Sequence, residues 1–155
     1  MKFLAALAFI AAASPATANG SAKDAVALWQ DDPARTFDGA ELSLDDFKWQ
    51  ARPIVIFADS PLDPAFQTQL ENLAQDFEEL EARDVVVIVD TSEDLTDLRR
   101  KFRPRGFQLV LISKEGDVAL RKPFPWDVRE LSRAIDKMPI RQREISEGRV
   151  DGVGG

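Results

Sequence analysis

The run Pro53-Ile-Val-Ile-Phe57 decides the fold class, and two similar runs follow it, Val85-Val-Val-Ile-Val89 and Phe107-Gln-Leu-Val-Leu-Ile112. Nearly continuous apolar runs of this length are typical of strands that are covered on both faces. Val118 to Arg121 predicts a fourth strand, and the turn at Glu115-Gly116-Asp117 makes it a hairpin partner of the third. The sequence therefore predicts a sheet that is buried on both sides.

Helical patterns fill the gaps between these runs. Asp63 can cap a helix whose apolar stripe runs through residues 66–80 at spacings of three and four. Ser92 can cap a second, shorter helix. A third helix is expected from the capping box at Asp127, and Pro139 is expected to end it.

The predicted element order is β-α-β-α-β-β-α, an α/β protein. Its βαβ crossovers must be right-handed. A central parallel pair with an antiparallel hairpin added gives a mixed four-stranded core sheet with helices on both faces. This is the thioredoxin arrangement.

Three residue types are absent from the chain: cysteine, histidine and tyrosine. Without them the protein has no thiolate nucleophile, no imidazole general base and no ordinary ligand set for zinc, copper or haem. We therefore expect neither thiol oxidoreductase nor cysteine peroxidase activity, and no cofactor.

The first eighteen residues have the order of a secretory signal peptide. Lys2 supplies the positive charge, residues 3–13 form an apolar run too short to span a bilayer, and Ala16-Thr17-Ala18 is a small-x-small cleavage site. The alternative interpretation is a buried N-terminal helix. Cleavage after Ala18 predicts a periplasmic or secreted protein whose mature chain has no membrane span.

The remaining chain is the length of one domain. We expect a polar entry segment at residues 19–45, a thioredoxin-like domain at 46–145 and a disordered, glycine-rich tail at 146–155. Loss of Lys2 with the signal peptide changes the formal net charge from −7 to −8. Such a charge argues against nucleic acid as a partner.

Several segments resemble the peroxiredoxin and thioredoxin superfamily. Residues 41–47 and 52–58 resemble its entry and first core strand, and Pro61-Leu62-Asp63 resembles the turn before the catalytic helix of a peroxiredoxin. On this overlay Thr68 stands where the peroxidatic cysteine would be, and Gln108 stands where thioredoxins carry a cis-proline. The resemblance implies the scaffold without its chemical residues.

A narrower resemblance covers about residues 46–145. It is carried by Lys48-Trp49, Arg52-Pro53, Gln69, Gly106-Phe107, Lys114-Glu-Gly116, Ile135-Asp136, Met138-Pro139, Arg141 and Glu144. These residues look like domain of unknown function family 4174 (DUF4174), a cysteine-less thioredoxin/peroxiredoxin-like domain of exported bacterial proteins. The resemblance implies fold and export, and it brings no established activity.

One dense basic run stands out in this acidic chain. It comprises Arg99, Arg100, Lys101, Arg103 and Arg105, at the end of the second predicted helix. Two interpretations are open: a binding site for a carboxylate, a phosphate or an acidic polymer, or cations that complement the dipole at a helix C-terminus. The first predicts an acidic ligand or an unknown protein as the partner.

Asp59 and Asp63 lie at the carboxyl end of the first strand, where open α/β sheets bind ligands. They could hold a hard cation such as Ca²⁺. The alternative is that Asp63 caps the following helix and Asp59 fixes the turn.

These features favour an exported, non-catalytic thioredoxin-like binding or accessory module without thiol redox activity. One alternative is an enzyme that uses carboxylate and arginine chemistry at the edge formed by Asp59, Asp63, Arg105 and Gln108. Another is a stress-response protein that acts through a redox partner.

Overall fold

The computed structural model describes residues 22–151 of the chain, so the predicted signal peptide lies outside the described residues. The elements follow in this order: α1 (Ala22–Asp31), β1 (Thr36–Asp38), the 3-10 helix η1 (Leu44–Phe47), β2 (Arg52–Phe57), α2 (Pro64–Gln75), α3 (Phe77–Glu81), β3 (Val85–Asp90), α4 (Asp97–Phe102), β4 (Gln108–Ile112), β5 (Val118–Lys122), α5 (Val128–Asp136) and α6 (Pro139–Asp151). Within this part of the chain, none of the helices has both the length and the apolar character needed to cross a bilayer.

The sheet is mixed, with the strand order β1-β3-β2-β4-β5. β1, β3 and β2 run parallel, and Ile54 of β2 pairs with Val87 of β3. β4 lies antiparallel to β2, and β5 completes the hairpin with Leu111 opposite Leu120. The parallel pair and the antiparallel hairpin that the sequence predicts are therefore confirmed, as is the α/β class.

The sheet has five strands instead of the four expected, because the segment at residues 19–45 contains α1 and β1. Phe37 of β1 pairs with Ile88 and is buried. Trp29 of α1 is 7% exposed, and its Nε1 donates a hydrogen bond to the main-chain oxygen of Val85 at 3.0 Å. A three-residue strand with one apolar residue leaves no periodic pattern in the sequence, so the sequence indicated only an irregular segment here.

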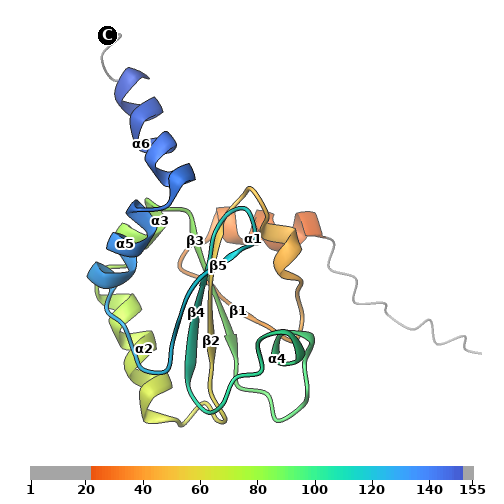
Figure 1. Cartoon of the computed structure of the whole chain (residues 1–155). Helices are drawn as coiled ribbons and strands as arrows, with labels where there is room; N and C mark the ends of the chain where they lie inside the picture. The colour runs from red at the N-terminus through yellow and green to blue at the C-terminus, as the bar shows by residue number, and fades with distance from the viewer. Residues whose placement is uncertain (1–21, 152–155) are drawn as a thin grey trace, which may run out of the picture.

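Two hydrophobic clusters lie on opposite faces of the sheet. Side chains alternate along β2: Ile54 and Ile56 face the cluster covered by α2, α3 and α5, whereas Val55 and Phe57 face the one covered by α1, η1 and α4 (Figure 1). All four are fully buried. Burial of each such side chain stabilises the fold by roughly 1.5–3 kcal/mol, so the continuous apolar run drives the three-layer packing.

The helix caps agree with the sequence at two of three positions. Asp63 accepts hydrogen bonds from the first turn of α2, and Asp127 forms a reciprocal capping box with Glu130. The second predicted helix begins later than expected, because Thr96 and not Ser92 caps α4. The main-chain N–H of Ser92 instead donates to the Asp90 carboxylate at 3.0 Å, which holds the loop before α4.

Pro139 begins a helix as well as following one. α5 ends at Asp136, and α6 starts with Pro139 at its first position, where the missing N–H costs no hydrogen bond. Residues 146–151 of the tail that we expected to be disordered continue this helix. Figure 1 shows α6 projecting beyond the end of the sheet that lies away from α4.

Candidate functional site

The five cations of the basic run do not form one site, and Arg99 is the first to separate from the others. Its Nε donates to a carboxylate oxygen of Asp90 at 3.1 Å, and its Nη2 donates to the main-chain oxygens of Ala58 at 2.7 Å and Asp90 at 3.0 Å. Asp90 is fully buried. Arg99 therefore ties the carboxyl ends of β2 and β3 together, and its role is structural.

Arg100 and Lys101 also lie outside a common site. Arg100 forms an exposed ion pair with Asp97 at 2.9 Å, which contributes at most about 1 kcal/mol. The Lys101 amine lies 5.5 Å from the ring centroid of Phe102, and this lysine borders a hollow that also contains Asp45 and Asp97. Both cations thus have acidic side chains within their own surroundings.

Arg103 and Arg105 converge with two cations from β5, Arg121 and Lys122. These four residues, the basic edge, line one hollow of about 290 Å³ together with Phe107, Gln108 and Pro123. None of the seven lining residues is acidic. Within residues 22–151, no carboxylate forms an ion pair with any of the four cations.

The two cations from β5 are held in place by aromatic and main-chain contacts. Arg121 donates to the main-chain oxygen of Phe102 at 3.0 Å and lies 5.2 Å from the centroid of its ring. The Lys122 amine lies 4.5 Å from the Trp126 ring. Sequence reasoning missed both residues, although the predicted hairpin implies that the end of β5 lies beside the start of β4, where Lys122 pairs with Leu109.

The backbone that carries Arg103 has an unusual conformation. Arg103 ends α4 with φ 48° and ψ 55°, the left-handed region that glycine usually occupies at this position. Its N–H donates to the main-chain oxygen of Arg99 at 2.9 Å. Strained backbone at a non-glycine residue is concentrated at functional sites, so this conformation supports a role for the Arg103 side chain.

The acidic residues near this edge are engaged or separate from it. Asp63 Oδ1 accepts hydrogen bonds from the main-chain N–H groups of Ala65 at 2.8 Å and Phe66 at 3.3 Å, which is the capping alternative. Asp59 is exposed, and neither Asp59 nor Asp63 lines the hollow that contains Arg105 and Gln108. Among residues 22–151, no group of three carboxylates is placed to hold a metal ion.

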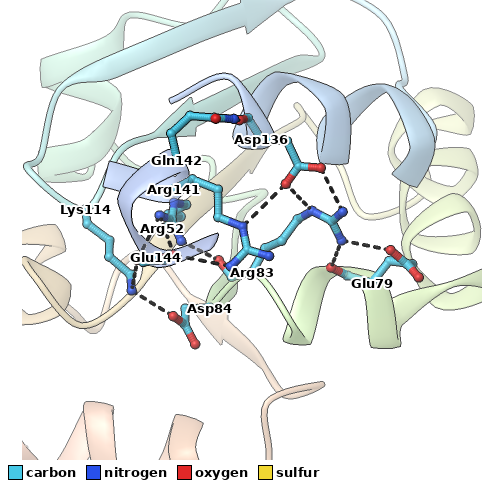
Figure 2. A network of polar contacts seen from close by, with 9 residues as sticks. All are labelled: Arg52, Glu79, Arg83, Asp84, Lys114, Asp136, Arg141, Gln142 and Glu144. Atoms are coloured by element: carbon cyan, nitrogen blue, oxygen red, sulfur yellow. Dashed lines mark hydrogen bonds and ion pairs between the residues drawn. The ribbon is translucent and has the colours of Figure 1, made fainter. Parts of the chain in front are cut away.

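A second group of charges occupies the opposite end of the sheet, at the amino ends of β2 and β3 (Figure 2). This amino-end network consists of Arg52, Glu79, Arg83, Asp84, Lys114, Asp136, Arg141 and Glu144. Arg52 is fully buried; its Nη1 donates to the main-chain oxygen of Arg83 at 2.8 Å, and its Nη2 lies 3.1 Å from both carboxylate oxygens of Glu144. Lys114 Nζ bridges Glu144 and Asp84 at 2.7 Å each.

The other half of the network joins α3 to the α5–α6 junction. Arg83 makes two hydrogen bonds of 2.9 Å to the Asp136 carboxylate and one of 2.8 Å to Glu79. Arg141 connects the halves, because its guanidinium reaches Asp136 at 3.4 Å and Glu144 at 3.3 Å. Every carboxylate in the network thus has at least one cationic partner.

The electrostatics of the network follow from these contacts. Burial alone would raise the pKa of Glu144, but hydrogen bonds from Lys114 and Arg52 hold this pKa below its ordinary value of 4.5. The hydrogen bonds from Arg83 lower the pKa of Asp136 below 3.8, against a smaller opposing effect of burial. The same bonds raise the pKa of Arg83. The network is therefore fully ionised at neutral pH.

Comparisons with known proteins agree with this architecture. Residues 43–144 match the family model described as "Domain of unknown function (DUF4174)". The chain belongs to this family. Among solved structures, the crystal structure of chloroplastic thioredoxin z is similar to the chain, with a TM-score of 0.50, 20% sequence identity and coverage of 66% of this chain and 93% of that chain. The likeness shows that the DUF4174 domain has a thioredoxin-like fold. No curated protein matches the chain.

The residues that carry the resemblance to DUF4174 in the sequence make structural contacts in this chain. Five of them belong to the amino-end network: Arg52, Lys114, Asp136, Arg141 and Glu144. Gln69 is buried and makes two hydrogen bonds to the main chain of Trp126, at 2.8 and 2.9 Å. These DUF4174 residues therefore position helices and loops around the sheet.

Proposed function

We propose that this DUF4174 domain is an exported, non-catalytic binding or accessory module that binds an anionic ligand at its basic edge. One observation carries the proposal: four cations surround a hollow that no acidic residue lines. Guanidinium and ammonium groups are the side chains that bind carboxylates and phosphates most strongly. An unidentified acidic ligand or an acidic segment of a partner protein meets this requirement.

The physical argument rests on where charge is neutralised. The whole chain carries a formal net charge of −7, so four cations without carboxylate partners are a local departure from its overall field. Like charges around one hollow repel each other, and a bound anion would remove that repulsion. The position supports the proposal as well, because ligands of open α/β sheets bind outside the carboxyl ends of the strands.

The alternatives gain less support from the structure. An enzyme at this edge requires a carboxylate that is available as a base. Asp90 is buried there, but one of its oxygens accepts from Arg99 and Ser92, and the other accepts from the Thr96 hydroxyl at 2.5 Å. A stress-response role through a redox partner would require the partner to supply all thiol chemistry, since the chain has no cysteine.

A thermal-shift experiment tests the anion site. Sulfate, phosphate and an acidic glycan should each be tested, and at least one should raise the melting temperature of the purified protein. The effect should fade as sodium chloride is added, because salt screens the charges. The double variant Arg103→Ala, Arg105→Ala should lose the shift and keep the fold.

The chain offers a matched control from the same basic run. The double variant Arg100→Ala, Lys101→Ala removes the same number of charges from residues outside the hollow. It should bind the anion like the wild type. An equal loss in both double variants would show that only net charge matters, and no shift with any of the three anions would refute the site.

Export is tested separately. The order of Lys2, the apolar run and Ala16-Thr17-Ala18 supports cleavage after Ala18. Expression with the native leader, followed by N-terminal sequencing of the product outside the cytoplasm, should give a chain that begins at Asn19. A full-length cytoplasmic product would refute export and leave the anion site unaffected.

A further inference from the structure

A second hollow lies far from the basic edge in the sequence of elements, between α3 and α5. It has a volume of about 370 Å³, and its wall on α5 is formed by Arg129, Ser132 and Arg133. Asp76 and Arg83 contribute from the other side. A space of this size is large enough for a small organic molecule and far exceeds the volume of one water.

Ser132 supplies the first sign that the hollow binds a ligand. The side chain is 93% buried, since its exposed fraction is 7%. Its hydroxyl has no hydrogen-bond partner among the described residues. Buried hydroxyl groups in folded proteins are nearly always paired, so a ligand in the hollow that this residue lines would provide the missing partner.

The charges around the hollow divide into used and unused groups. Arg83 donates to Asp136 and Glu79, so these three side chains neutralise one another (Figure 2). Arg129 and Arg133 are exposed and form no ion pair within residues 22–151. They stand four residues apart on α5, which places them on the same face of the helix as neighbours.

Asp76 is the unused acidic group. It occupies the junction between α2 and α3, yet its carboxylate makes no cap hydrogen bond to α3 and no ion pair with a described residue. The hollow thus presents two guanidinium groups and a hydroxyl from one wall and a free carboxylate from the other.

We infer that this hollow binds a small zwitterion of the α-amino acid type. The ligand's carboxylate would lie against Arg129, Arg133 and the Ser132 hydroxyl, and its ammonium group would lie against Asp76. This arrangement pairs all four unused groups at once. A simple anion would leave Asp76 facing a like charge, and a simple cation would leave both arginines unpaired.

Calorimetric titration with the standard free amino acids tests the inference. At least one should bind the purified protein. For that amino acid, the N-acetyl derivative lacks the ammonium charge and the methyl ester lacks the carboxylate, so both should bind at least tenfold more weakly. Equal binding of either derivative would overturn the zwitterion assignment, and no binding of any free amino acid would overturn the site.

Variants separate the site from general effects on stability. Ser132→Ala should weaken binding about tenfold, the effect of one hydrogen bond to a charged group, without lowering the melting temperature of the free protein, because the hydroxyl has no partner to lose. Arg133→Gln and Asp76→Asn should each weaken it at least as much. Arg105→Gln at the basic edge is the matched control and should bind like the wild type. Unchanged affinity in Ser132→Ala would overturn the proposed contact.

Discussion

The two ends of the sheet hold charged clusters that look alike in the sequence and differ in the structure. At the amino ends of β2 and β3, the amino-end network pairs each carboxylate with a cation, and one of those cations, Arg52, is fully buried. At the carboxyl ends, the basic edge gathers four cations around a hollow without an acidic lining residue. The first cluster is closed on itself, whereas the second is open to a ligand.

This difference shows what a count of charges cannot tell. Arg99 and Arg103 lie four residues apart in the same basic run, but Arg99 bonds to the buried Asp90 and Arg103 faces the open hollow. Burial and pairing, which depend on the fold, decide whether a cation stabilises the protein or remains available for binding. The predictions below test this distinction residue by residue.

The largest expected effect is at Arg99. Its replacement in Arg99→Ala leaves the Asp90 carboxylate buried without its cation, and breaking such a pair costs about 3–5 kcal/mol. Arg103→Ala removes the same charge from an exposed position and should change the free energy of unfolding by less than about 0.5 kcal/mol. Urea unfolding of the two variants measures both values. Similar losses would contradict the division of the run.

A smaller loss is expected at Glu144 in the amino-end network. Glu144→Gln keeps the shape of the side chain but removes the charge that Arg52, Lys114 and Arg141 share. We expect a loss of about 2–3 kcal/mol, since Arg52 keeps its hydrogen bond to Arg83 and Lys114 keeps Asp84. Glu147→Gln, an exposed position on the same helix, is the control. A loss of equal size in the control would place the effect in α6 and not in the network.

The network also predicts how stability depends on pH. The folded-state pKa values of Glu144 and Asp136 lie below the ordinary values of 4.5 and 3.8. A lowered pKa stabilises the fold fully above the ordinary value, and this stabilisation is lost as the pH falls through the folded-state pKa. The free energy of unfolding should therefore decrease as the pH is lowered below 4.5. Glu144→Gln should make this decrease shallower, and an unchanged slope would show that other carboxylates cause it.

Most of the sheet could be predicted because its strands are continuous apolar runs. Pro53 to Phe57 and Val85 to Val89 need no partner to be recognised, and their burial on both faces follows from composition alone. β1 could not be predicted in this way, because its three residues contain one apolar side chain. Pro139 was misread as only a stop, although proline is equally favourable at the first position of a helix.

The candidate site was predicted only in part. Arg103 and Arg105 could be found because they are close in sequence, whereas Arg121 and Lys122 come from another strand and join them only through the β4–β5 pairing. The residues of the DUF4174 resemblance could be named, but a sequence pattern gives no distances. That Arg52 and Glu144 meet across 92 positions depends on where α6 begins.

The smallest and sharpest test is a substitution that should help the fold and harm the site. Arg103 holds φ 48° at the end of α4, a conformation that glycine adopts without steric cost. Arg103→Gly relieves that strain but gives the unfolded chain more freedom, so the net gain should be small, up to about 1 kcal/mol. The same change removes one of the four cations that line the basic edge, so the thermal shift with anions should shrink. Arg103→Ala shares the loss of charge and keeps the strain, which makes it the matched control: both variants should bind anions equally poorly, and the glycine variant should unfold at higher urea. If glycine is no more stable than alanine at this position, the left-handed backbone stores no strain there, and the conformation of Arg103 gives no support to a binding role.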